Sequence, residues 1–243
     1  MNSPEEIAAL EKALDAAKDY ADTVLKGPLA ELGGILTDTI GYWRLKNRVR
    51  LMLRAKQWLE EKGVHPKGIL PEVFVPLIEE GGNVEDETLS DMFASLLACH
   101  LDPEQQELVH PSYAKALAQL SPLDARVMAL FSVFFSHQTV QEFEQRGATL
   151  AVDRVAHEIG VRLAVTFLSC LNLERLGIIE HVGYRLPATE DEGYPATHRY
   201  RPENQLYRFT VYGRAFCNAC QYNERLNAPN QGESHNTVRR ADV

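Results

Sequence analysis

One stretch of the chain, residues 42–62, has apolar side chains at helical spacing on two faces at once. The first face carries Leu45, Val49, Met52 and Leu59. The second face carries Leu51, Ala55 and Trp58. A helix that is apolar on two faces must pack against neighbours on both of them. The stretch therefore predicts a bundle with this helix inside it, ended by Gly63 and the following His65-Pro66.

Further helices are predicted around it from start and stop signals. Their approximate ranges are 4–25, 71–82, 86–101, 113–120 and 122–135. The last of these begins at Ser121-Pro122-Leu123-Asp124, where a cap serine is followed three residues later by an acid. Residues 29–41 are small and apolar, and Gly33-Gly34 inside them indicates a kink or a close helix contact.

After Gly147 the pattern changes. We expect short helices at 152–159 and 163–176, separated by a turn at Gly160, then strands from Ile178 and at 206–211, and a final helix at 213–222. A helix–turn–helix followed by a hairpin is the plan of a winged helix. The predicted fold class is thus mainly α, with an N-terminal helical bundle and a winged-helix-like α+β C-terminal domain that contains a short β-hairpin.

The expected domain organisation has four parts. They are an N-terminal helix (1–26), a helical domain (27–146), a winged-helix-like domain (147–224) and a polar disordered tail (225–243). The first residues are acidic and lack the apolar segment of a secretory signal, and no apolar run reaches the length of a membrane span. Four cysteines in 243 residues are too few for a disulfide scaffold, so we expect a cytoplasmic protein.

Charge is distributed unevenly along the chain. The formal net charge is -9, which argues against a general nucleic-acid coat. Residues 39–59 nevertheless carry six Lys and Arg and no acid, whereas residues 79–107 carry nine Asp and Glu and no Lys or Arg. The two blocks either pair with each other or leave one face cationic for a partner.

The cations of residues 39–59 form the predicted binding surface. Lys46, Arg50 and Arg54 are spaced by four and line up as a stripe between the two apolar faces, while Arg44 and Arg48 lie on the opposite side. A cationic helix of this kind meets an acidic protein, nucleic-acid phosphates or an anionic lipid surface. The pattern leaves these three classes of partner open.

The winged-helix-like region offers a thinner set of candidate nucleic-acid contacts. These are Arg162, Asn172, Arg175, Arg199 and Arg201. Most other side chains of the second helix are apolar, and four acids of the hairpin region offset its arginines. We therefore favour a winged-helix-like structure that does not bind DNA, with DNA binding as the alternative.

Patterns typical of catalysis or cofactor binding are weak. Cys217-Asn218-Ala219-Cys220 is a CxxC without a second ligand pair, and its thiols are better interpreted as small buried side chains than as zinc ligands. Ser112-Tyr113-Ala114-Lys115 matches the spacing of a Ser–Lys nucleophile but has no accompanying motif. We expect no catalytic residue, no metal, no cofactor and no small-molecule substrate, although catalytic groups from distant positions leave no local motif. Self-association through Phe131, Phe134 and Phe135 stays open beside their interpretation as core.

Several blocks, taken together, resemble the Abi-alpha family of bacterial proteins. The blocks are IGYWRLKNRVRL at 40–51, EKGVHPK at 61–67, LSDMFASLLA at 89–98, VHPSY at 109–113 and LSPLDA at 120–125. Weaker similarity continues through Leu176-Gly177 and residues 209–220. The family is grouped with abortive infection, in which an infected bacterium blocks phage production. The resemblance thus implies a phage-defence role on an α-helical domain, and it supplies no catalytic residues.

The leading hypothesis is a non-enzymatic phage-defence protein that acts by binding, through the cationic stripe. Two alternatives belong to other classes. One is a winged-helix DNA-binding regulator. The other is a membrane-surface effector that inserts residues 27–43 beside the basic helix.

Overall fold

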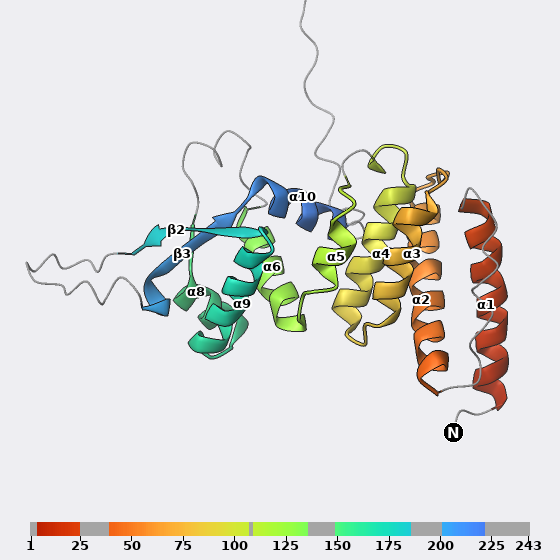
Figure 1. The fold of residues 1–243 in the computed structure, drawn as a ribbon, viewed down its shortest axis with the longest axis horizontal. Coiled ribbons are helices and arrows are strands. Elements are labelled where there is room, and N and C mark those ends of the chain that lie inside the picture. The colour runs from red at the N-terminus through yellow and green to blue at the C-terminus, as the bar shows by residue number, and fades with distance from the viewer. Residues whose placement is uncertain (1–3, 25–38, 107–108, 136–148, 186–200, 222–243) are drawn as a thin grey trace, which may run out of the picture.

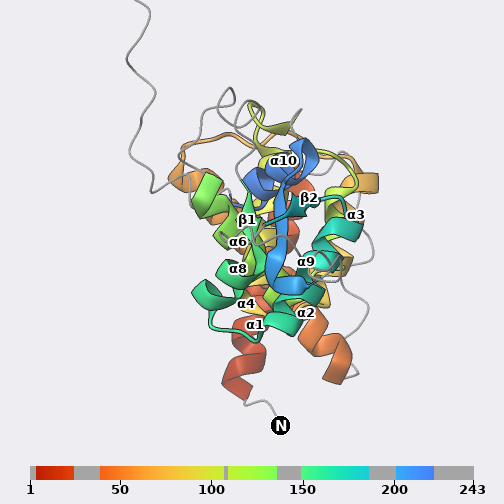
Figure 2. The same ribbon diagram turned by 90° about the vertical axis from the view of Figure 1, so that its left-hand side faces the viewer.

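The computed structural model describes residues 4–24, 39–106, 109–135, 149–185 and 201–221. The molecule is elongated and mainly helical, with a small three-stranded antiparallel sheet in the C-terminal part (Figures 1 and 2). Its helices are α1 (Pro4–Val24), α2 (Thr39–Glu61), α3 (Pro71–Gly82), α4 (Glu87–Leu101), α5 (Tyr113–Leu117), α6 (Pro122–Phe135), α8 (Val152–Ile159), α9 (Leu163–Arg175) and α10 (Val211–Cys220). The strands are β1 (Leu150–Ala151), β2 (Ile179–Tyr184) and β3 (Gln205–Phe209), with a 3-10 turn, η3 (Pro202–Asn204), before β3.

Helix α2 lies inside the bundle, packed against α1, α3 and α4 (Figure 1). Both of its predicted apolar faces are buried, which confirms the two-faced pattern. The amide of Asn47 on α2 also donates to the carbonyl oxygen of Val84 at 2.9 Å, just after α3. The prediction for α1 was less accurate at its start, because Ile7 is 44% exposed although it continues the apolar spacing.

Two helix starts are capped by side chains, and one of these caps was predicted from the sequence. At α4, the carboxylate of Asp86 accepts from the backbone N–H of Leu89 at 3.0 Å. At α6, the N–H of Asp124 donates to Ser121 Oγ at 3.2 Å, and the N–H of Ser121 donates to Asp124 Oδ2 at 2.7 Å. This reciprocal pair is a capping box, so the predicted helix start at Ser121 is confirmed.

The sheet has the strand order β1-β3-β2, with both pairings antiparallel. Tyr207 of β3 pairs with Leu150 on one side and with His181 on the other, and a bulge between His181 and Gly183 shifts the register. The predicted hairpin is thereby present, as β2 and β3. The two-residue strand β1 was not predicted, because so short a strand shows no alternation. Helices α8 and α9 meet at Gly160, whose positive φ of 66° suits glycine.

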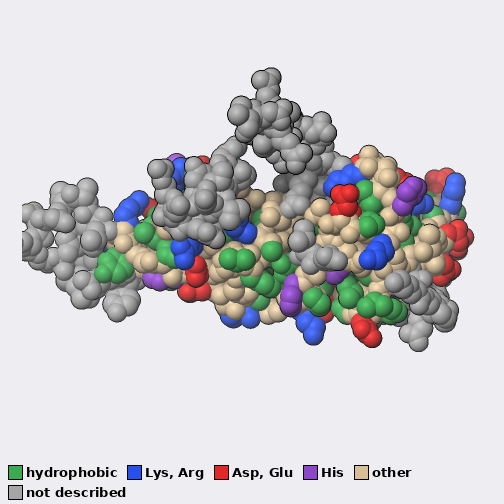
Figure 3. All heavy atoms as spheres, turned by 90° about the horizontal axis from the view of Figure 1, so that it is seen from above, with side chains coloured by type: hydrophobic (Ala, Val, Ile, Leu, Met, Phe, Trp, Pro, Cys, Tyr) green, Lys and Arg blue, Asp and Glu red, His purple; other side chains and the backbone are tan. Residues whose placement is uncertain are grey.

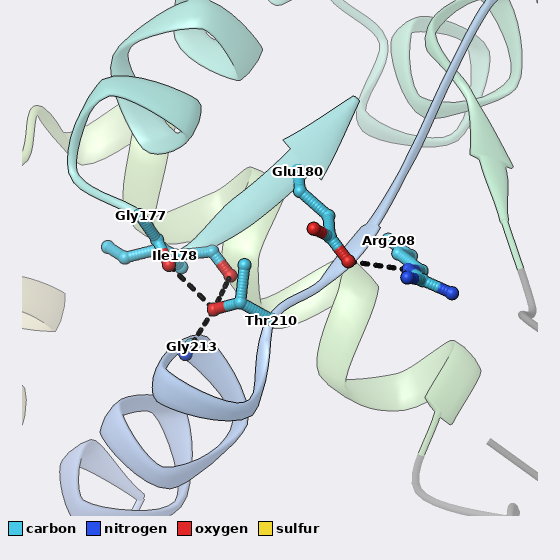
Figure 4. A network of polar contacts seen from close by, with 6 residues as sticks. All are labelled: Gly177, Ile178, Glu180, Arg208, Thr210 and Gly213. Atoms are coloured by element: carbon cyan, nitrogen blue, oxygen red, sulfur yellow. Dashed lines mark hydrogen bonds and ion pairs between the residues drawn. The ribbon is translucent and has the colours of Figure 1, made fainter. Parts of the chain in front are cut away.

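Helix α10 begins at Val211, before the predicted start at residue 213, because the chain turns at Thr210 directly after β3. Thr210 Oγ1 accepts from the N–H of Gly213 at 2.8 Å and donates to the carbonyl oxygen of Gly177 at 2.6 Å (Figure 4). The backbone N–H of Thr210 donates to the carbonyl oxygen of Ile178 at 3.1 Å. Beside this corner, Arg208 of β3 pairs with Glu180 of β2 at 2.6 Å. Thr210 therefore caps α10 and ties it to the segment that leads into β2.

Helix α10 returns from the sheet to the helical bundle and packs against α4 and α6 (Figure 1). Cys99 Sγ of α4 donates to the carbonyl oxygen of Ala219 at 3.3 Å, and Ser112 Oγ lies 2.9 Å from the hydroxyl of Tyr212. One continuous hydrophobic core includes buried residues from α1 through α10. The N-terminal and C-terminal parts thus share a core.

Some predictions fall outside the residues that the structure describes. These are the tail 225–243, the Gly33-Gly34 kink, the boundary at 146/147, most of the loop between β2 and β3, and the side chain of Phe135. Phe131 is fully buried, and Phe134 packs beside the core. Among the helices of the described residues, none combines the length and the apolar character that a membrane span requires.

Candidate functional site

A groove of about 520 Å³ lies between α1 and α2. The α1 wall consists of Glu6, Ala9, Leu10 and Ala13. Leu10 is buried and Ala13 is half-buried, so the small side chains of this wall leave space over an apolar floor. The groove therefore lies where small side chains of α1 face α2, and the two helices run parallel, because Tyr20 near the end of α1 contacts Lys56 near the end of α2.

The α2 wall brings the predicted cationic stripe into this groove. Lys46 and Arg50 both line it and are exposed, one helical turn apart. Val49 and Leu53 lie in the same wall. Tyr42 and Gln57 line the groove at the two ends of this wall. The site thus combines two exposed cations with an apolar floor. Among the described residues that line it, Glu6 is the single acid.

Arg54 lines the same groove but is already engaged by the acidic block. Its guanidinium is ion-paired with Asp91, and it lies 3.4 Å from Glu87 Oε1, both on α4. The stripe and the acidic block therefore meet at one end, at the third member of the stripe. For Lys46 and Arg50, the described part of the chain shows no acidic partner within ion-pair distance.

The two cations predicted on the opposite side of α2 differ from each other. Arg48 is half-buried against Gly82, where a Cβ would lie 2.7 Å from Arg48 Cγ. Arg44 is exposed. The structure therefore brings Lys46, Arg50 and Arg54 together in the groove, and it leaves Arg44 and Arg48 outside it.

The candidate nucleic-acid contacts lie at the other end of the molecule and are partly used within the chain. Arg175 donates to Gln119 Oε1 at 3.1 Å and to Asn172 Oδ1 at 2.8 Å. Asn172 donates in turn to Asp124 Oδ2 at 2.9 Å. These bonds attach α9 to the start of α6.

The remaining candidates of this set are Arg162, Arg201 and Arg199. Arg162 is exposed at the N-terminal end of α9, and Arg201 lies 3.7 Å from Glu203. Arg199 lies outside the described residues. The outward face of α9 is largely apolar, because Leu168 is 64% exposed and Leu171 is 39% exposed. Among the candidates that the structure describes, Arg162 and Arg175 lie at opposite ends of α9, and the exposed Leu168 and Leu171 lie between them.

The CxxC motif is part of α10, on the side of that helix that packs in the core against α4. Cys217 and Cys220 are both buried, and burial raises the pKa of Cys220 well above its ordinary value, as do the nearby thiols Cys217 and Cys99. A raised pKa keeps the thiol protonated, which disfavours both metal binding and nucleophilic reactivity. Within the described residues, no three His, Cys, Asp or Glu side chains group as metal ligands would.

Sequence reasoning found the α2 side of the groove and missed the α1 side. Ala9 and Ala13 are spaced by four and lie beside the periodic leucines of α1. A pair of small residues at this spacing is a signal for a shallow helix surface, but the sequence does not say which helix lies opposite.

No curated protein and no solved structure matches the chain at a significant level. The family model of abortive infection alpha matches residues 45–220, which is most of the chain and includes α2 from Leu45 onward. The match confirms the family resemblance of the sequence blocks. The chain belongs to the abortive infection alpha family, and this membership implies a role in phage defence.

Proposed function

We propose that the protein acts in phage defence by binding an anionic partner through Lys46 and Arg50 in the groove between α1 and α2. The observation that carries the proposal is the pair of exposed cations over an apolar floor. Family membership supports the process in which the protein acts.

The surroundings of the two cations support a binding role over a purely solvated one. Charge interactions strengthen where apolar walls exclude water, so a cation beside Val49 and Leu53 attracts an anion more strongly than one on an open surface. The third cation of the stripe, Arg54, is ion-paired with α4, whereas no acid of the described residues pairs with Lys46 or Arg50. The net charge of -9 makes this cationic pair a local feature, which favours a specific contact over general anion binding.

The test is a phage challenge of bacteria that carry variant genes. Lys46→Glu/Arg50→Glu should abolish protection while the protein still folds and accumulates. The matched control is Lys67→Glu/Lys115→Glu, which makes the same charge change at two exposed lysines outside the groove. The control should protect like the wild type. Full protection by the groove variant would reject the proposal.

We also infer that the C-terminal part, from β1 to β3, is winged-helix-like. Supporting this assignment, β1, α8, α9, β2 and β3 follow in that order, and their sheet has the order β1-β3-β2.

This assignment concerns the fold, and two observations weigh against direct DNA readout. Asn172 and Arg175 are hydrogen-bonded to α6 and its lead-in, and the outward face of α9 is apolar. We expect no retention of duplex DNA at physiological salt. If the wild type retains duplex DNA and Arg162→Glu does not, the result would instead favour the DNA-binding alternative.

A further inference from the structure

We propose that the occupant of the α1–α2 groove is one acidic amphipathic helix of a partner protein. This inference rests on the function proposed above and specifies the chemistry of the partner. The relevant features are the shape of the groove, the spacing of its cations and the charge of the helix beside it.

The shape of the groove fits a third helix. Its α2 wall extends from Tyr42 to Gln57, which corresponds to roughly 22 Å of helix axis. An occupant helix of about 15 residues covers that length at 1.5 Å per residue. On the α1 wall, Ala9 and Ala13 are the small side chains that let a neighbouring helix axis approach closely.

The spacing of the cations defines the pattern that the occupant must carry. Lys46 and Arg50 are four residues apart and therefore roughly 6 Å apart along the axis. Two Asp or Glu residues four apart on a partner helix match them. The floor formed by Leu10, Val49 and Leu53 requires an apolar stripe next to those acids. Amphipathic helices dock into apolar grooves in this manner.

The charge of α1 distinguishes a helix from an anionic membrane. The outward-facing side of α1 carries the exposed acids Glu5, Glu11, Asp15, Asp19 and Asp22. Figure 3 shows acidic side chains gathered at the end of the molecule where α1 lies. A flat anionic bilayer that reached Lys46 and Arg50 would also meet these acids and be repelled. A single helix reaches the groove without covering the outer side of α1.

The probe for this proposal is a designed peptide of 16 residues with leucines along one helical face and glutamates four apart beside them. Its twin carries lysine in place of each glutamate. Fluorescence anisotropy with the full chain should show binding of the acidic peptide and not of the twin. Lys46→Glu/Arg50→Glu should weaken binding of the acidic peptide about 10-fold or more. The same variant should gain affinity for the lysine twin, and Lys67→Glu/Lys115→Glu should leave binding unchanged.

A second variant tests the groove rather than charge alone. Ala9 is exposed on the α1 wall, so Ala9→Trp fills the groove without entering the core. This variant should keep the wild-type melting temperature and lose the acidic peptide. Unchanged binding by Ala9→Trp would show attraction to charge without docking and would overturn the proposal.

Three further outcomes test the partner and separate this inference from the proposed function. In the first outcome, the wild type sediments with vesicles of phosphatidylglycerol and phosphatidylcholine, Lys46→Glu/Arg50→Glu does not, and the peptide fails to bind. This result would show that the partner is a lipid surface and would overturn the proposal of a helix. Phage protection that depends on Lys46 and Arg50 without peptide binding would retain the function and reject this partner. If the wild type binds the acidic peptide but Lys46→Glu/Arg50→Glu still protects against phage, the partner chemistry is retained and the proposed function is rejected.

Discussion

Gly213 of α10 lies so close to the backbone before β2 that a Cβ on it would overlap the carbonyl oxygen of Ile178. That same carbonyl oxygen accepts the N–H of Thr210 at 3.1 Å, and Thr210 Oγ1 accepts the N–H of Gly213 (Figure 4). The absence of a side chain at residue 213 therefore lets α10 begin directly against the entry to β2.

Gly213→Ala should destabilise the protein, because the added methyl group must push α10 away from Ile178 and strain the Thr210 cap. We expect a loss of about 1–3 kcal/mol or more in the free energy of unfolding, as for overpacked sites. Urea denaturation followed by circular dichroism measures it. Asn218→Ala, at an exposed position of the same helix, is the control and should change the free energy by less than about 0.5 kcal/mol. A stable Gly213→Ala would mean that the corner is looser than its contacts indicate.

Asp124 holds α6 and α9 together through its buried carboxylate. Its Oδ2 accepts from Ser121 Oγ at 2.8 Å and from Asn172 Nδ2 at 2.9 Å, and its Oδ1 accepts from Ser169 Oγ. Asp124→Asn replaces one acceptor by a donor that faces other donors. We expect a loss of about 3 kcal/mol by thermal or urea unfolding, since hydrogen bonds to a charged group contribute more than neutral ones. Glu158→Gln, on the exposed surface of α8, should unfold like the wild type.

Much of the helical fold could be predicted because its signals are local. The cap at Ser121 and Asp124, the turn at Gly160 and the two faces of α2 each depend on residues within one or two helical turns. The start of α10 was placed two residues late, because its position depends on Thr210 bonding to Gly177 and Ile178 more than thirty residues earlier.

The candidate site could be predicted on one side alone. Helical spacing places Lys46, Arg50 and Arg54 on one stripe, but it does not show which of them is paired with an acid. Packing separates them, because Asp91 of α4 engages Arg54, whereas the alanines of α1 leave a groove beside Lys46 and Arg50. That separation depends on which helices become neighbours, and spacing within α2 holds no information about it.

The different surroundings of Arg54 and Arg50 should give them different roles in stability. Arg54→Gln removes a partly buried ion pair with Asp91, and we expect a loss of about 1 kcal/mol in the free energy of unfolding. Arg50→Gln should change it by less than about 0.5 kcal/mol, because its side chain is exposed. Parallel urea titrations compare the two. Equal destabilisation by both substitutions would indicate that Arg50 also has a structural partner.

The buried imidazole of His100 on α4 should make stability depend on pH. Burial lowers the pKa of His100 from 6.5 to about 4, because the charged form loses its hydration. In the unfolded chain the ring takes up a proton as the pH falls below about 6.5, whereas in the folded chain it stays neutral until about pH 4. The unfolded state thus binds more protons across this window, so the free energy of unfolding decreases as the pH falls from about 6.5 to about 4.

The expected decrease from this one group is up to about 3 kcal/mol, with no further contribution below about pH 4. Urea titrations at a series of pH values measure it, and His100→Gln, which cannot titrate, serves as the comparison. The difference in stability between the wild type and His100→Gln should be constant above about pH 7 and should shift against the wild type on acidification. A difference that stays constant down to pH 4 would mean that His100 is protonated in the folded protein, with an acceptor that compensates its charge.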